Sequence, residues 1–134
     1  MKPVILMVDD EKVVLESLTN QLKRAFGYTF KYETALGVDE AWEVLEDLHA
    51  EGEPVALIIS DWLMPPDKGD YFLIQVTQKY PNIPQIMLSG FADEASVERA
   101  RQNANLKEFI AKPWDEENLI NKIRQIIPPE VFAN

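Results

Sequence analysis

The feature that most constrains the fold is a set of short apolar runs separated by amphipathic stretches. Residues 4–8 and 55–59 are apolar throughout, and residues 85–89 and 108–111 contain shorter runs of the same kind. An apolar run without alternation is typical of a strand buried on both faces, as in a parallel sheet covered by helices. Residues 29–34 alternate instead, which predicts an edge strand with one face in water.

Between these runs, apolar residues recur at helical spacing. The stripes lie within residues 14–25, 38–48, 72–76, 93–105 and 119–127. Glycine or proline follows four of them and ends the helix. The stretch 93–105 has few large apolar side chains beyond Val97, so we expect a weakly anchored, mobile helix there. Strands and helices in alternation predict an α/β fold, a parallel sheet with right-handed crossovers and helices on both faces.

Composition sets outer limits on function. The chain has 134 residues, 46% of them hydrophobic, which is enough for one domain with its own core. It has no cysteine, which excludes disulfide scaffolds, thiol catalysis and cysteine-based zinc sites. The net charge of −10 argues against direct binding to nucleic acid or to an anionic membrane. The longest apolar run near the start has five residues, too few for a signal peptide or a membrane span, so a cytoplasmic location is expected.

Polar residues follow the predicted strands, where ligands of parallel α/β sheets bind. They are Asp9, Asp10, Asp61, Ser89, Gly90 and Lys112. Two carboxylates about 4 Å apart repel by roughly 4 kcal/mol at an effective dielectric of 20, so converging acids require a cation. A hard divalent ion such as magnesium meets that need, and it would leave Asp61 able to attack a phosphoryl group. Lys112 and Ser89 would contact the phosphoryl oxygens, and Gly90 would leave room for the phosphate.

These residues form a set that closely resembles the receiver domain of bacterial two-component response regulators, including chemotaxis regulators. The set is Asp9-Asp10-Glu11, Asp61 with Met64-Pro65 and Gly69, Ser89-Gly90, Phe109, and Lys112-Pro113. The resemblance runs from residue 3 to about residue 127. It implies a flavodoxin-like, doubly wound five-stranded parallel sheet of order 2-1-3-4-5, with five helices in a three-layer α/β/α arrangement. It also implies a receiver domain over residues 1–127, with residues 128–134 as a tail or the start of a linker.

The resemblance further implies a phosphorylation site. Asp61 would accept a phosphoryl group from a histidine of a sensor kinase or histidine phosphotransfer protein. Asp10, Asp61 and the backbone carbonyl of Leu63 would bind Mg²⁺, for which Mn²⁺ is an expected substitute, with Asp9 helping directly or through water. Lys112 would pair with the phosphoryl oxygens. The protein would promote its own phosphorylation and dephosphorylation without being a turnover enzyme.

Phosphorylation would then change a surface. In the family resembled, Ser89 turns toward the phosphoryl group beside Gly90, and Phe109 changes rotamer. The responding face would be the fourth helix, fifth strand and fifth helix. It would control a downstream effector protein or an output domain, and a homodimer after phosphorylation is left open.

Departures from the commonest family pattern bear mainly on rates. Phe109 replaces the frequent tyrosine and lacks its hydroxyl group. Leu63 and Phe91 stand at positions that flank the phosphoryl group in the family, and both are apolar here. We predict that they obstruct in-line attack by water and so make self-dephosphorylation slow.

Several alternatives accompany this interpretation. Phosphatases of the haloacid dehalogenase class need a second aspartate two residues after the nucleophile, where this chain has Leu63. A receiver-like interaction module that works without phosphorylation is the main rival. Asp9 and Asp10 could simply cap the first helix. Of the tryptophans, Trp114 is expected to cover the start of the last helix, and Trp62 to face the mouth of the crevice.

Overall fold

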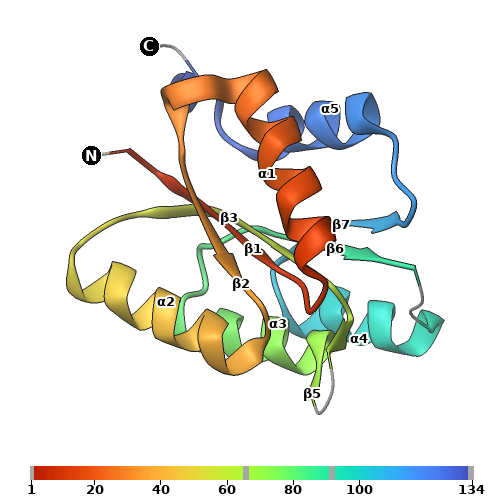
Figure 1. Cartoon of the computed structure of the whole chain (residues 1–134). Coiled ribbons are helices and arrows are strands. Elements are labelled where there is room, and N and C mark those ends of the chain that lie inside the picture. The colour runs from red at the N-terminus through yellow and green to blue at the C-terminus, as the bar shows by residue number, and fades with distance from the viewer. Residues whose placement is uncertain (1, 65–66, 91–92, 133–134) are drawn as a thin grey trace.

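The architecture is a five-stranded parallel sheet between two layers of helices (Figure 1). A computed structural model describes residues 2–64, 67–90 and 93–132 and, within these, all side chains but those of residues 63, 64 and 67–69. The strands are β1 (Val4–Val8), β2 (Lys31–Ala35), β3 (Val55–Ser60), β6 (Gln85–Ser89) and β7 (Leu106–Ala111). Their spatial order is β2-β1-β3-β6-β7, which confirms the predicted flavodoxin-like topology.

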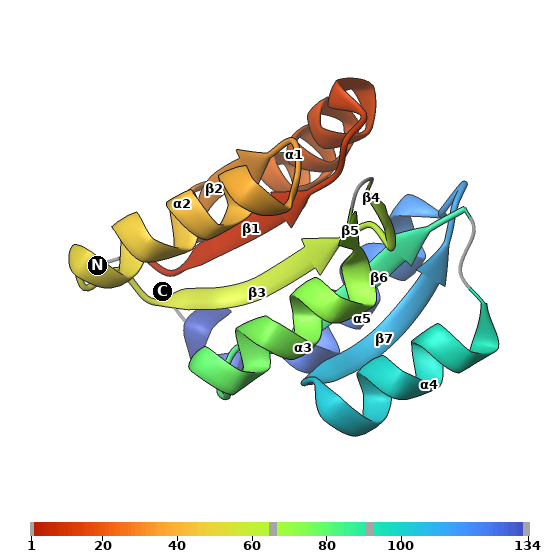
Figure 2. The same cartoon turned by 90° about the horizontal axis from the view of Figure 1, so that it is seen from below.

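Five helices complete the three layers. They are α1 (Lys12–Phe26), α2 (Val38–Ala50), α3 (Gly69–Lys79), α4 (Glu94–Asn103) and α5 (Glu116–Ile126). Helices α1 and α5 cover one face of the sheet, and α2, α3 and α4 cover the other (Figures 1 and 2). Two apolar clusters fill the spaces between the sheet and these helix layers. Strand β1 contributes to both, because alternate side chains of a strand point to opposite faces.

Local chemistry fixes several helix ends. Helix α1 stops at Gly27, whose φ of 55° lies in the left-handed region that glycine adopts without strain. Helices α4 and α5 begin after Asp93 and Asp115, whose carboxylates accept hydrogen bonds from the backbone N–H groups three residues ahead. These caps satisfy backbone donors that a helix start leaves without intrahelical partners.

Three details differ from the sequence-based expectation. Strand β2 begins at Lys31 because residues Gly27–Thr29 form a 3₁₀ turn, η1. Strand β7 begins two residues earlier than predicted, at Leu106. A two-stranded antiparallel hairpin, β4 (Leu63–Met64) with β5 (Asp67–Lys68), follows β3 and was not predicted. Strands of two residues are too short to show any periodicity.

The end of the chain packs on the domain. Residues Pro129–Phe132 form a second 3₁₀ turn, η2. The Phe132 ring lies 5.5 Å from the Phe26 ring and 5.7 Å from the Phe30 ring, measured between centroids. The described part of the segment predicted as a tail therefore contacts α1 and Phe30, the residue after η1. No helix in the described ranges is long and apolar enough to cross a membrane.

Candidate functional site

Three acids meet at the carboxyl edge of the sheet. Asp9 and Asp10 follow β1, and Asp61 follows the neighbouring strand β3. The backbone N–H of Asp61 donates to the carbonyl oxygen of Val8 at 2.9 Å, which fixes the ends of the two strands side by side. One carboxylate oxygen from each of the three acids lies within 4.8 Å of the others. Residues 52 positions apart in the chain thus form one cluster.

The three acids differ in their exposure to solvent. Asp9 is 1% exposed and Asp61 is 5% exposed, whereas Asp10 is open to solvent. Burial raises the pKa of Asp9, and the neighbouring charge of Asp61 adds to that rise, although hydrogen bonds from Lys112 and Glu11 oppose it. The buried part of the cluster therefore carries more negative charge than its surroundings stabilise.

Lys112 supplies the one positive charge that the described residues bring into contact with these acids. Its backbone N–H donates to the Ser89 carbonyl at 3.0 Å, which anchors the end of β7 beside β6. Its ammonium Nζ lies 2.7 Å from Asp9 Oδ2 and 3.5 Å from Asp61 Oδ2. Burial alone would lower the pKa of Lys112, but the Asp9 hydrogen bond and the charges of Asp61 and Asp9 outweigh it, so the pKa is raised. Lys112 is therefore a fixed cation.

Asp9 and Asp10 do not cap the first helix. The N-cap position of α1 is Glu11, with no side-chain cap hydrogen bond. Asp9 Oδ1 accepts instead from the backbone N–H of Glu11 at 2.8 Å, while Asp9 Oδ2 faces Lys112. The capping alternative is thus wrong. Asp9 is held through both of its carboxylate oxygens, with Oδ2 directed toward Lys112.

Ser89 and Gly90 lie at the same edge. Ser89 ends β6 and is 2% exposed. A Cβ atom built on Gly90 would lie 3.7 Å from the Cβ of Lys112, an ordinary van der Waals distance. The described neighbours therefore leave space beside Gly90 but do not by themselves demand glycine there.

Of the remaining predicted residues, the structure describes Phe109 in full and Leu63 only in its backbone. Phe109 on β7 is half-buried, packs against the cluster under α2 to α4, and lines a cavity of about 500 Å³ beside α4. The backbone of Leu63 belongs to β4, but its side chain is outside the described set. Phe91 also lies outside the described residues. The predicted effects of Leu63 and Phe91 on phosphoryl lifetime stay predictions.

The donor set suits a divalent cation. Three carboxylates against one ammonium leave a net negative site, and carboxylate oxygens are the ligands that Mg²⁺ accepts. Asp10, being exposed, leaves the cluster open to water, and Mg²⁺ usually keeps several waters. The geometry thus provides an acidic pocket able to bind a metal, with a fixed ammonium in contact with two of its acids.

Comparison with known proteins decides the family. Residues 5–124 match the family model described as the response regulator receiver domain. The chain belongs to this family. Receiver domains are signalling domains of two-component systems, so the flavodoxin-like fold and the acidic pocket of this chain are those of its family.

Curated relatives extend the match over most of the receiver domain. A chemotaxis protein CheY homolog of Campylobacter jejuni is 30% identical over 125 residues, which covers 92% of this chain and 91% of that protein. The hydrogenase transcriptional regulatory protein HoxA of Cupriavidus necator is 31% identical over 123 residues, again 92% of this chain. The match spans only 24% of HoxA.

Solved structures agree with the receiver fold. The signal receiver domain of an HD domain-containing protein from Pseudomonas fluorescens has a TM-score of 0.82 at 27% identity, with 94% of each chain covered. A CheY-like receiver domain protein from Methanospirillum hungatei has a TM-score of 0.81 at 23% identity and 93% coverage of each chain, a likeness of fold alone.

Two tryptophans flank the receiver site without entering it. Trp62 is 4% exposed and belongs to the apolar cluster under α2 to α4, so the expectation that it faces the crevice mouth is wrong. Trp114 packs against the other cluster and donates from Nε1 to Gln21 Oε1 at 2.7 Å, which joins the start of α5 to α1. Its structural role is confirmed.

Two contacts of charged residues are not predicted by the sequence. The first is the direct Asp9–Lys112 ion pair, because the family resemblance assigns Lys112 to the phosphoryl oxygens. Asp70, on the first turn of α3, is fully buried and pairs with Arg99 of α4. Asp70 comes just before a helical stripe of apolar residues. An aspartate at the start of a helix is usually exposed to solvent, so the local sequence does not predict that Asp70 is buried.

Proposed function

We propose that this receiver domain accepts a phosphoryl group on Asp61, in a magnesium-dependent reaction, from a histidine of a sensor kinase or histidine phosphotransfer protein. One observation carries the proposal: the buried Asp61 carboxylate lies within 4.8 Å of two other acids and 3.5 Å from the Lys112 ammonium. A carboxylate used only for stability would gain nothing from two like charges beside it.

The ion would be held by residues that include the acidic cluster. Asp10 and Asp61 offer carboxylate oxygens, the backbone carbonyl of Leu63 would complete the set, and Asp9 would help directly or through water. Mn²⁺ would substitute for Mg²⁺. A bound divalent ion would offset the repulsion among the acids and the negative charge of a phosphoryl group.

The chain's own residues carry the transfer. An Asp61 carboxylate oxygen attacks phosphorus while the bond from phosphorus to the donor's histidine nitrogen breaks, and that nitrogen keeps the electron pair. The product is an acyl phosphate on Asp61 and a free histidine. Lys112 pairs with the new phosphoryl oxygens, and the Ser89 hydroxyl donates to one of them, while Gly90 leaves space for the group.

The output would arise at the surface formed by α4, β7 and α5. Phe109 sits between the sheet and α4, so a turn of Ser89 toward the phosphoryl group would let the Phe109 ring move inward. A downstream effector protein or an output domain would bind the changed surface. HoxA is a transcriptional regulator and its name suggests one such output, but this chain could equally signal by docking, as a CheY-like protein would.

Leu63 and Phe91 stand at sequence positions that flank the phosphoryl group in the family, and we infer that they would prolong the phosphorylated state. Leu63 and Phe91 would obstruct water in line with the phosphoryl group, so the acyl phosphate would be lost slowly.

We also propose that the protein acts in the cytoplasm. Its net charge of −10 supports the further proposal that it does not bind nucleic acid or an anionic membrane directly.

Mass spectrometry after incubation with acetyl phosphate and magnesium tests the proposal. The parent should gain the mass of one phosphoryl group, and the Asp61→Asn variant should gain none. Equal gains in both, or none in the parent, would contradict it. In the latter case the interaction module that works without phosphorylation becomes the better account.

A further inference from the structure

Helix α4 is held to the domain by fewer buried apolar side chains than α1 is. It buries only Ser96 and Ala100, whereas α1 buries four apolar side chains: Leu15, Leu18, Leu22 and Phe26. Val97 adds a partly buried contact to the apolar cluster below. Burial of so few apolar groups gives a weak and non-directional attachment, which would not by itself fix where the helix sits.

A polar contact supplies what apolar packing lacks. Asp70, on the first turn of α3, is 0% exposed. Its Oδ2 accepts from Arg99 Nε at 2.9 Å, and Arg99 Nη2 donates to the buried Ser96 Oγ at 3.1 Å. The Arg99 guanidinium carbon lies 5.5 Å from the centre of the Tyr71 ring, which covers it from outside. We call Asp70, Ser96 and Arg99 the α3–α4 latch.

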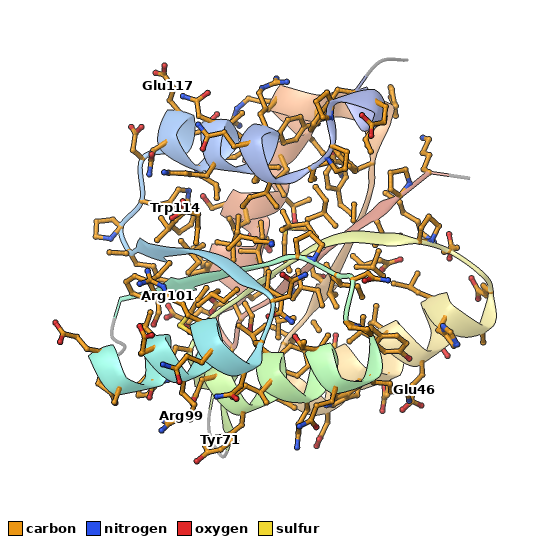
Figure 3. The ribbon with its side chains drawn as sticks, turned by 180° about the vertical axis from the view of Figure 1, so that it is seen from behind. Glu46, Tyr71, Arg99, Arg101, Trp114 and Glu117 are labelled. Atoms are coloured by element: carbon orange, nitrogen blue, oxygen red, sulfur yellow. The ribbon has the colours of Figure 1, made fainter. Side chains whose placement is uncertain are left out.

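The latch joins the two helices at their outer edge. Arg99 and Tyr71 lie together there, while Arg101 lies on the side of α4 toward β7 (Figure 3). Among the described residues, Asp70 Oδ1 has no hydrogen-bond partner, so Arg99 provides the charge compensation that this buried carboxylate has. A buried carboxylate without a partner is strongly unfavourable, so moving α4 away from α3 meets a specific resistance.

Both helices of the latch begin soon after residues of the acidic site in the sequence. Asp70 comes nine residues after Asp61, directly behind the β4–β5 hairpin, and α4 begins five residues after Ser89. We propose that the α3–α4 latch holds α4 in its unphosphorylated position and that it opens when α4 shifts. Arg99 and Asp70 are thus positioning residues for the switch. The proposal rests on the proposed function, but its first test does not need phosphorylation.

Amide hydrogen exchange of α4 in the unphosphorylated protein is that first test. Arg99→Gln should speed exchange of the α4 amides at least tenfold, and the double variant Asp70→Asn with Arg99→Gln should keep most of that effect without leaving a buried charge. Arg101→Gln removes the same charge from the same helix and should change exchange less than twofold. Arg24→Gln breaks an exposed ion pair with Glu116, between α1 and α5, and should also change α4 amide exchange less than twofold.

A second measurement is the affinity for beryllofluoride with magnesium, which mimics a phosphoryl group. It distinguishes a latch that fixes the position of α4 from one that only stabilises the fold. Opening the latch removes resistance to the shifted state, so Arg99→Gln should bind the mimic severalfold more tightly than the parent, while Arg24→Gln should match the parent. A latch that only stabilises the fold would lower the unfolding midpoint without raising this affinity.

The outcomes keep the two proposals apart. Unchanged α4 exchange in both latch variants, or weaker binding of the mimic by Arg99→Gln, would overturn the latch even if Asp61 is phosphorylated. A parent that never gains a phosphoryl group would overturn the proposed function, while faster α4 exchange would still show that the latch holds the helix. Circular dichroism identifies any variant that fails to fold, and Arg99→Lys, which keeps the charge, then replaces it with an expected intermediate exchange rate.

Discussion

Removing the Lys112 ammonium should destabilise the domain, and magnesium should restore part of the loss. Lys112→Met keeps the apolar stem and removes the charge that lies 2.7 Å from Asp9 and 3.5 Å from Asp61. At an effective dielectric of 20, those distances correspond to roughly 6 and 5 kcal/mol of attraction before desolvation is subtracted. Breaking a buried pair by removing one partner costs about 3–5 kcal/mol. Because the Lys112 side chain keeps 16% exposure, we expect the lower end, about 3 kcal/mol.

Urea unfolding with and without excess magnesium measures both effects. Without the ion, Lys112→Met should lose about 3 kcal/mol of unfolding free energy. A divalent ion at about 100 times its dissociation constant stabilises by about 2.7 kcal/mol, and the variant should gain more from it than the parent because its acids lack a cation.

Lys122→Met is the matched control. Lys122 pairs with Glu108 at 3.2 Å, with both side chains 34% exposed. Lys122→Met should therefore lose no more than about 1 kcal/mol of unfolding free energy relative to the parent, and that difference should be the same with and without magnesium. The reasoning is refuted if Lys112→Met is as stable as the parent without the ion, or if magnesium stabilises both variants equally.

Three further predictions concern neighbouring features. The double change Leu63→Asn with Phe91→Glu should shorten the phosphoryl half-life by about tenfold, measured by the decay of the phosphorylated mass; an unchanged half-life contradicts the water-obstruction argument. The raised pKa of Asp9 means that the folded state holds its proton more tightly than the unfolded state does. This group's contribution to stability therefore falls as pH rises from its ordinary pKa of 3.8 through the raised pKa of the folded state. Urea unfolding across that range should therefore show stability that falls less, or rises more, with pH in Asp9→Asn than in the parent, and identical slopes would count against the burial of Asp9. Trp114→Phe should lose about 1 kcal/mol of stability with the Gln21 hydrogen bond, by the same unfolding assay, and no loss would mean that the bond contributes nothing.

The sequence predicted the fold well where an apolar run was unbroken or apolar residues recurred at helical spacing. The apolar run of residues 4–8 reappears as β1 without a change of boundary, because both faces of that strand are buried. The alternating edge strand was predicted two residues early, since η1 occupies Gly27–Thr29. The β4–β5 hairpin escaped prediction because antiparallel pairing of two residues with two leaves no pattern in a sequence.

The acidic cluster was also predictable, because strand ends of a parallel sheet share one edge. The contacts between the charged side chains were less predictable than the cluster itself. Whether Lys112 turns to Asp9 or to Asp61 depends on differences of less than 1 Å between competing partners. The burial of Trp62 and Asp70 depends on how α2, α3 and α4 pack on one another, and no local pattern encodes that.

A magnesium titration followed by backbone amide NMR tests the central claim most directly. If the acids at this edge hold a divalent ion beside Asp61, saturable shifts should concentrate at Asp9, Asp10, Asp61 and Lys112, and Asp10→Asn should weaken them at least tenfold in apparent affinity. Small, unsaturable shifts spread over the acidic surface, unaltered by Asp10→Asn, would contradict the account.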